Sequence, residues 1–410
     1  MPALEPAVRR FIGARALNTL GRAVIGATVL WELYQRTRDP LVLAGVGLVQ
    51  VVPVVLLFVP SGNLVDRADR RRLATGAAAA AGAIGLGLAL ASALAAPVAV
   101  YLALLLALGG CTSVHAPAAS SLLPMIAARA SLPRTNRVLS SFSELSQIGG
   151  PSLAGLALAA VAPCWVYAFV AVTGLLSAAL YRSLPPARPS APAAGAGARD
   201  WRAGVTYIRR SPLLLPAMAL DMFAILFAGV TALLPAIATD ILHVGPFGYG
   251  ILRASQPVGA VAMALIGGRL RAWKKPGRVL LIVVALYGLA TMGIGLSTWL
   301  PITAVCLVAC GGLDNISVVI RLTLEQLVVP DAIRGRVSAV HYVFIGMSNE
   351  LGAAESGLAA SLLGTMPAIV GGGAIAVLVA GLVAVKWREL AKMPPLSELT
   401  PEQDVPARAQ

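Results

Sequence analysis

Long apolar segments recur along the whole chain, and short polar stretches separate them. A helix that crosses a bilayer needs about 20 mostly apolar residues, and the sequence supplies about twelve such runs. In the first half they cover 11–33, 40–62, 73–95, 98–127, 138–161 and 164–182. In the second half they cover 212–239, 247–270, 278–298, 301–329, 338–364 and 367–386. The pattern predicts an all-α polytopic membrane protein with about twelve transmembrane helices.

The composition agrees with this fold class. Of 410 residues, 58% are hydrophobic and only 12% are charged, a balance that excludes an ordinary soluble domain. The first apolar run contains Arg15 and Arg22, so we expect it to act as a membrane helix and not as a cleavable signal peptide.

The net charge of +14 could indicate nucleic-acid binding, but the basic residues cluster in alternate loops. The other loops carry almost none, with Arg36 and Arg38 as exceptions. Basic loops stay in the cytoplasm, so the pattern predicts a multi-pass inner-membrane protein with both termini cytoplasmic and contacts to membrane lipids. The basic clusters are Arg9 and Arg10, 67–72, 129–137, 182–210, 269–278, Arg334 and Arg336, and 386–392.

A Pro/Ala/Gly segment, "PPARPSAPAAGAGAR", divides the chain in two and cannot bury a core. After it, Trp201, Val205 and Ile208 share one helical face, which predicts a short amphipathic helix on the inner leaflet. The predicted parts are an N-terminal six-helix bundle (1–184), a cytoplasmic linker with this helix (185–210), a C-terminal six-helix bundle (211–392) and a cytoplasmic tail (393–410).

The two halves are faintly similar in sequence. "GGCTSVHAPA" lies within the fourth apolar run and "GGLDNISVVI" lies at the equivalent place in the tenth. Parallel repeats of six helices are typical of transporters that bind their substrate between the halves. The repeat therefore favours transport by alternating access, for which a monomer suffices.

Charged residues inside the apolar runs are the best evidence for a site, because each costs roughly 2.5 kcal/mol or more at the bilayer centre. Proton coupling needs a carboxylate that gains and loses a proton as its surroundings change. The candidates for coupling are Glu144, Asp221, Asp314 and Glu350, and His341 is the only histidine that merits the same test. The candidates for the cavity and substrate are Asn18, Arg22, Asn315, Arg321, Glu325, Tyr342 and Asn349.

Spacing adds two expectations about these candidates. Arg15, Asn18 and Arg22 form one polar stripe that we expect to face the cavity. Arg321 and Glu325 lie four residues apart, so Glu325 either pairs with Arg321 or takes part in coupling.

The stretch "GNLVDRADRRR" joins the second and third apolar runs. Gly62, Asp66, Arg67, Arg70 and Arg71 match the G-x-L-x-D-R-x-x-R-R signature of the major facilitator superfamily. Glycine at the start permits a tight turn where the chain leaves the membrane. The resemblance implies that this loop closes the cytoplasmic side when the cavity opens outward, with Asp66 and Arg71 contributing most.

A second motif lies in the fifth apolar run, where "SQIGGPSLAG" partly matches G-x-x-x-G-P-x-x-G-G. Gly150, Pro151 and Gly155 match, whereas Ser146 and Ala154 replace glycines with residues that still allow close helix approach. Together with "YQRTRDPLVLAGVGLVQVVP" and "GYGILRASQPVGAV", the motif resembles the twelve-helix drug:proton antiporter branch, which includes enterobactin-type exporters.

This resemblance implies a secondary transporter that exports small amphipathic compounds, drug-like or siderophore-like, by proton antiport. A lipid or lysophospholipid flippase and a proton-coupled importer remain alternatives, and a non-transport membrane scaffold is a third. The sequence has no G-x-x-x-x-G-K loop, no G-x-S-x-G and no H-E-x-x-H, which argues against an enzyme, a metal site or a bound cofactor.

Overall fold

A computed structural model describes residues 5–127, 132–186, 201–267 and 273–399. The described residues form helices and loops and no strands, which confirms the predicted fold class. Within these ranges the side chains of Asp66, Arg67, Glu144, Tyr342 and Trp201 lie outside the described part of the protein.

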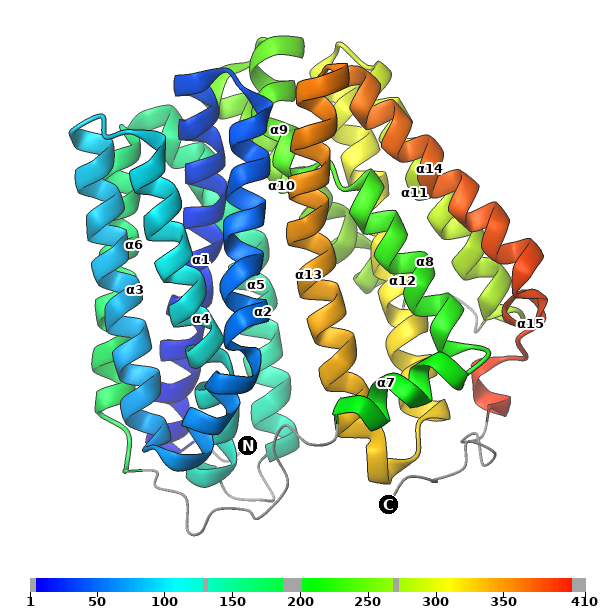
Figure 1. The fold of residues 1–410 in the computed structure, drawn as a ribbon, viewed down its shortest axis with the longest axis horizontal. Coiled ribbons are helices and arrows are strands. Elements are labelled where there is room, and N and C mark those ends of the chain that lie inside the picture. The colour runs from blue at the N-terminus through cyan, green and yellow to red at the C-terminus, as the bar shows by residue number, and fades with distance from the viewer. Residues whose placement is uncertain (1–4, 128–131, 187–200, 268–272, 400–410) are drawn as a thin grey trace. The chain divides into compact units, whose positions relative to one another are not determined.

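The chain folds into two compact units. Unit 1 contains 1–38, 45–198 and 244–254, and unit 2 contains 39–44, 199–243 and 255–410. The helices of the first half are α1 (Pro6–Thr37), α2 (Pro40–Arg67), α3 (Arg70–Ala93), α4 (Val98–Ile126), α5 (Leu132–Ala160) and α6 (Pro163–Arg182) (Figure 1).

The second half begins with the short helix α7 (Trp201–Arg210). Its long helices are α8 (Leu214–Ala228), α10 (Gly245–Gly267), α11 (Pro276–Leu296), α12 (Leu300–Val328), α13 (Asp331–Leu363) and α14 (Thr365–Lys386). Shorter elements are η2 (Thr231–Leu233), α9 (Leu234–Ala236), η3 (Ile237–Ile241), α15 (Arg388–Ala391) and η4 (Leu396–Glu398).

Over the described residues each predicted apolar run coincides largely with helix, the seventh with a break at Gly229, and nine helical segments of the described chain are long and apolar enough to span a membrane. The other three long helices, α1, α5 and α13, are more polar: their sequences hold Arg15, Glu144 and Glu350 among other charges. A span that carries charge must bury it against protein or water. For these three helices the structure must account for how each charged side chain is paired or solvated.

The seventh span is discontinuous. Helix α8 ends at Ala228, Gly229 is extended with ψ 95°, and the chain continues through η2, α9 and the π-helix η3. The hydroxyls of Thr291 and Ser356 donate to the carbonyls of Ala228 and Gly229 at 3.5 and 3.2 Å. A break inside a membrane helix is stable when neighbouring side chains satisfy the freed backbone groups in this way.

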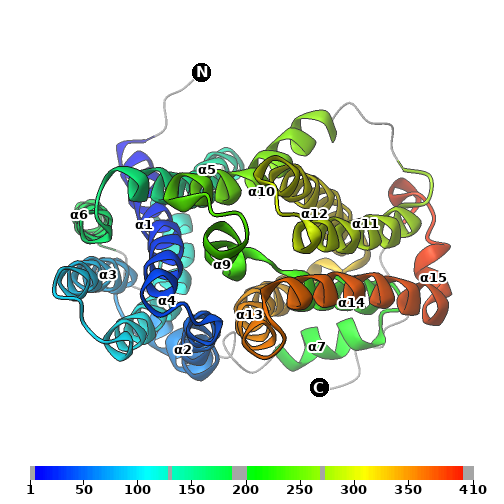
Figure 2. The same ribbon diagram turned by 90° about the horizontal axis from the view of Figure 1, so that it is seen from above.

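Each half uses the same small-residue contact between its third and sixth long helices. Helices α3 and α6 lie side by side in both ribbon views (Figures 1 and 2), and a Cβ built on Gly174 would lie 2.6 Å from the Cα of Gly82. In α11 and α14, a Cβ on Gly288 would lie 2.5 Å from the carbonyl oxygen of Gly373. Glycine lets these backbones approach closely where hydrocarbon gives no driving force for association.

The structure corrects the placement of two predicted features. Gly62 makes no turn: α2 runs through it to Arg67, and the break before α3 consists of Ala68 and Asp69. The amphipathic helix α7 exists, but Ile208 on its predicted lipid face is buried in the core of unit 2, and Val205 packs against that core. Tyr207 also donates a 2.9 Å hydrogen bond to the carbonyl of Val328. At least part of the predicted lipid face of α7 therefore packs on protein.

Candidate functional site

A buried ion pair joins helices α8 and α12 in unit 2. The carboxylate of Asp221 contacts the guanidinium of Arg321, and the two side chains are 7% and 3% exposed. Arg321 Nε also donates to Ser317 Oγ one turn earlier at 3.2 Å. Burying two charges is costly unless they pair and their remaining donors are satisfied, and both conditions are met here.

A second buried pair joins α12 and α13. His341 Nδ1 lies 2.5 Å from Glu325 Oε2, and the hydroxyl of Ser338 donates to Glu325 Oε1. Of the two alternatives for Glu325, pairing with Arg321 is therefore not observed. Each of the two residues points to a different neighbouring helix, so α12 is tied on one side to α8 and on the other to α13.

Asp314 completes the cluster two turns before Arg321. It is half-buried, and its carboxylate interacts electrostatically with Asp221 and Arg321. The five groups, Asp221, Asp314, Arg321, Glu325 and His341, include three carboxylates against one guanidinium and one imidazole. Like charges held close together in a buried site repel one another. The cluster brings together carboxylates and an imidazole, the residue types that proton coupling requires.

Asn18 and Arg22, predicted to share a polar stripe on α1, do lie together in unit 1. With Gly21 and Thr173 they line a cavity of about 10 Å³ between α1, α3, α4 and α6. Such a volume holds one water molecule. Asn18 is buried, so this part of the stripe faces the interior of the bundle.

A buried carboxylate that sequence reasoning missed lies at the far end of α1. Glu32 Oε1 accepts hydrogen bonds from Ser92 Oγ at 2.7 Å and Tyr101 Oη at 3.0 Å, and it pairs with Arg36 Nη2 at 2.5 Å. The guanidinium of Arg36 also lies over the Tyr101 ring. The signal was present, because Arg36 is a basic exception in its loop and follows an acid by four residues.

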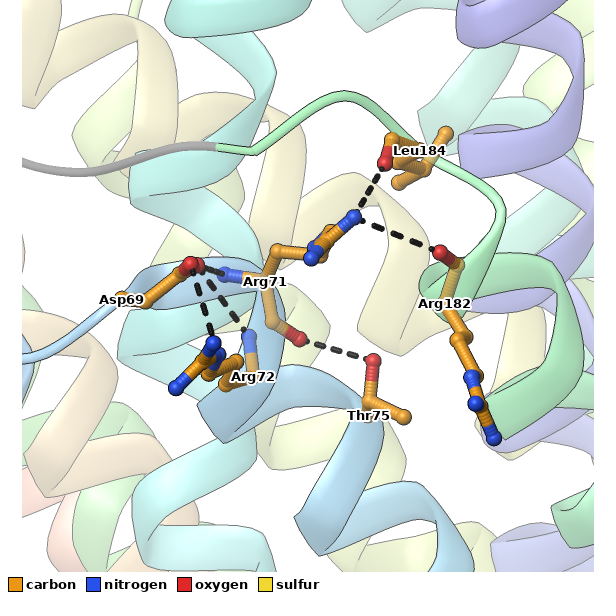
Figure 3. A network of polar contacts seen from close by, with 6 residues as sticks. All are labelled: Asp69, Arg71, Arg72, Thr75, Arg182 and Leu184. Carbon is orange, nitrogen blue, oxygen red and sulfur yellow. Dashed lines mark hydrogen bonds and ion pairs between the residues drawn. The ribbon is translucent and has the colours of Figure 1, made fainter.

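The loop motif between α2 and α3 ties three helices together (Figure 3). Asp69 caps α3 by accepting from the backbone N–H groups of Arg71 and Arg72 at 2.9 and 3.3 Å. Arg71 Nη1 donates to the carbonyl of Leu184 at 2.9 Å, just beyond the end of α6, where a cation complements the helix dipole. Arg70 reaches the carbonyl of Ser121 on α4 at 3.3 Å.

The motif in α5 packs against α1. A Cβ on Gly150 would lie 2.6 Å from the Cβ of Ala23, so only glycine fits at this contact. Ser146, which replaces a motif glycine, donates to the carbonyl of Ala16 at 3.2 Å. Pro151 is half-buried within the helix. Close contact between α5 and α1 thus explains the small residues Ser146 and Gly150 of the motif.

The remaining candidates on α12 and α13 are more exposed. Asn315 and Glu350 are half-buried. Asn349 is exposed, and its amide donates to Ile345 in its own helix at 2.9 Å. The structure does not bring these three into the cluster around Arg321.

Comparison with known proteins supports this architecture. A family model described as a transmembrane secretion effector matches residues 5–408. The enterobactin exporter EntS of Citrobacter koseri is 26% identical over 97% of this chain and 96% of its own, and that of Shigella boydii is 27% identical over 95% of each.

Solved structures show the same fold. A bacterial homolog of the human lysosomal transporter Spinster, in an inward-facing and occupied conformation, aligns with a TM-score of 0.73 over 93% of this chain and 96% of its own, at 13% identity. A POT family transporter in complex with 5-aminolevulinic acid aligns with a TM-score of 0.75 over the same shares, at 12% identity. The protein is a multi-pass membrane transporter and not an enzyme, and it belongs to the transmembrane secretion effector family of the major facilitator superfamily.

Proposed function

We propose that this protein exports a small amphipathic, siderophore-like compound across the inner membrane in exchange for protons, by alternating access. Export and the class of cargo are supported by the relatives, which are named enterobactin exporters and cover nearly the whole chain. Lipophilic drugs are the second class to test, because the α5 motif resembles that of drug:proton antiporters.

We assign proton exchange to the cluster of Asp221, Asp314, Arg321, Glu325 and His341. The observation that carries this mechanism is the burial of these charged groups in contact across α8, α12 and α13. Asp221 contacts the guanidinium of Arg321, and the charges of both residues act on Asp314. When cargo or water changes the surroundings of Arg321, the balance between these acids shifts, and one of them takes up or releases a proton.

The break in the seventh span supports movement next to this cluster. Asp221 lies on α8 two turns before the helix ends at Ala228. Discontinuous helices are common at the binding sites of secondary transporters, where they let one segment tilt without unfolding its neighbour. We propose that making or breaking the Asp221–Arg321 ion pair moves α8, and that the chain bends at the extended residue Gly229.

From the basic loops we infer that both termini are cytoplasmic. The loop motif then lies on the cytoplasmic side, where we assign Asp66 to closing the cavity and Arg70 and Arg71 to bracing the helices on which closure acts. The site is assembled from one chain, so the functional unit in this scheme is a monomer.

The experiment is export assayed in proteoliposomes with an imposed pH gradient, using enterobactin and a panel of lipophilic drugs. Cargo-dependent proton flux supports the proposal. Loss of that flux in Asp314→Asn supports the assignment of proton exchange to the cluster that contains Asp314. Movement of cargo that does not depend on the gradient would favour a facilitator or flippase, and movement in the opposite direction would favour an importer.

A further inference from the structure

A second group of buried polar side chains lies in unit 1, whereas the cluster around Arg321 belongs to unit 2. It consists of Arg15 on α1, His115 on α4 and Tyr181 on α6. His115 is 6% exposed, Tyr181 is fully buried, and their rings pack edge to face with centroids 5.5 Å apart. Phe11, one turn before Arg15 on α1, packs edge to face on the Tyr181 ring with centroids 6.1 Å apart, and Ser177 Oγ on α6 donates to the carbonyl of Ala14 at 2.8 Å. Arg15 therefore lies where α1 packs on α6 near Tyr181.

Each of these groups has a buried polar atom without a hydrogen-bond partner in the described chain: Arg15 Nη1, His115 Nε2 and Tyr181 Oη. No carboxylate among the described residues forms an ion pair with Arg15. Buried polar atoms are nearly always satisfied, and leaving one without a partner costs free energy. Three such atoms from three helices indicate a missing partner.

The donors specify the chemistry of that partner. A guanidinium offers a planar fork of N–H groups that suits carboxylates and other oxyanions, a tyrosine hydroxyl donates one hydrogen bond, and imidazole donates from Nε2 in one tautomer. Arg22 adds a second positive charge acting on His115. Arg15 is half-buried, whereas His115 and Tyr181 are buried, so Arg15 is the most accessible of the three side chains.

We propose that Arg15, His115 and Tyr181 form a binding site for the oxyanion group of an amphipathic organic anion. The inference rests on the proposed function, because the anion would be the charged end of the exported compound. It divides the work between the halves: the cationic site in unit 1 recognises cargo, and the acidic cluster in unit 2 exchanges the proton.

The test is equilibrium binding of 1-naphthoate and of its neutral analogue 1-naphthamide to the purified full chain in detergent, with no pH gradient. We expect 1-naphthoate to bind more tightly than the amide. Because a hydrogen bond to a charged group contributes about 1.5–3 kcal/mol, Arg15→Gln should weaken 1-naphthoate binding by about tenfold or more. Arg9→Gln is the matched control, since Arg9 is exposed on the same helix and loses the same charge.

Tyr181→Phe separates binding from folding. It removes a hydroxyl that has no partner among the described residues of the free protein, so thermal stability should be kept or raised while 1-naphthoate binding weakens several-fold. Equal affinity of the acid and the amide, or equal binding by Arg15→Gln and Arg9→Gln, would overturn the proposal. Anion binding that survives alongside failed export would leave this site standing and remove only the proposed function.

Discussion

His341 Nδ1 lies 2.5 Å from Glu325 Oε2. Glu325 makes this contact although Arg321 precedes it by only one turn on the same helix, α12. Arg321 turns instead to Asp221 on α8. Two charged residues of α12 therefore pair with different neighbouring helices, Arg321 with α8 and Glu325 with α13. A charge on His341 acts on Asp221, so the two pairs are linked electrostatically.

The Asp221–Arg321 pair predicts strongly non-additive stability effects. Asp221→Asn leaves Arg321 buried without a counter-charge, and breaking a buried pair costs about 3–5 kcal/mol. The double variant Asp221→Leu/Arg321→Met removes both charges and should recover most of that loss. Equilibrium unfolding in mixed detergent micelles measures all three proteins. Additive losses would show that the two residues do not act as a pair.

Glu32 predicts a stability effect at the other end of α1. Tyr101→Phe removes a hydrogen bond to a buried carboxylate and should cost about 1.5–3 kcal/mol. Tyr287→Phe on α11 offers a tyrosine control outside this cluster. Unfolding of the two variants in the same detergent compares them, and a Tyr101→Phe protein as stable as wild type would contradict the hydrogen bond between Tyr101 and Glu32.

The α5 motif predicts a difference between adjacent glycines. Gly150→Ala forces a methyl group against Ala23 and should cost about 1–3 kcal/mol through overpacking. Gly149→Ala has nothing within 4 Å of the added carbon, so it should be neutral or slightly stabilising. Thermal unfolding of the two proteins tests the contact, and equal melting temperatures would refute it.

Two aspartates three residues apart in the loop motif should behave differently. Asp69→Ala removes the cap of α3 and should cost about 0.5–2 kcal/mol of stability, with the export rate kept in the folded fraction. Asp66→Asn should slow export without changing the melting temperature, since we assign Asp66 to gating. Rates in proteoliposomes and melting curves in detergent check both. Loss of stability in Asp66→Asn with a normal rate would reverse these assignments.

The sequence predicted the helices well because bilayer length and the Gly/Pro-rich loops constrain them strongly. It also placed Asp314, Arg321 and Glu325 on one stripe of α12, which follows from helical periodicity alone. Asp221 was identified because a carboxylate within an apolar run demands a partner.

Partner choice was harder to predict. Glu325 and His341 are 16 residues apart on different helices, and the rotation of each helix about its axis decides whether they meet. The pairing of Arg321 with Glu325 satisfied the spacing rule within one helix but lost to better partners across helices. The predicted turn at Gly62 was wrong because the polar end of α2 stays helical and continues to Arg67. Glycine permits a turn but does not require one.

The most direct test of the proposed mechanism measures proton movement in proteoliposomes during enterobactin export by wild type and Asp314→Asn, with Ser361→Ala as a control for an exposed polar residue on α13. We predict cargo-dependent proton flux in wild type and in the control, and gradient-independent export or no export in Asp314→Asn. Full proton coupling in Asp314→Asn would contradict the assignment of proton exchange to that carboxylate. Export without proton flux in wild type would contradict the antiport mechanism itself.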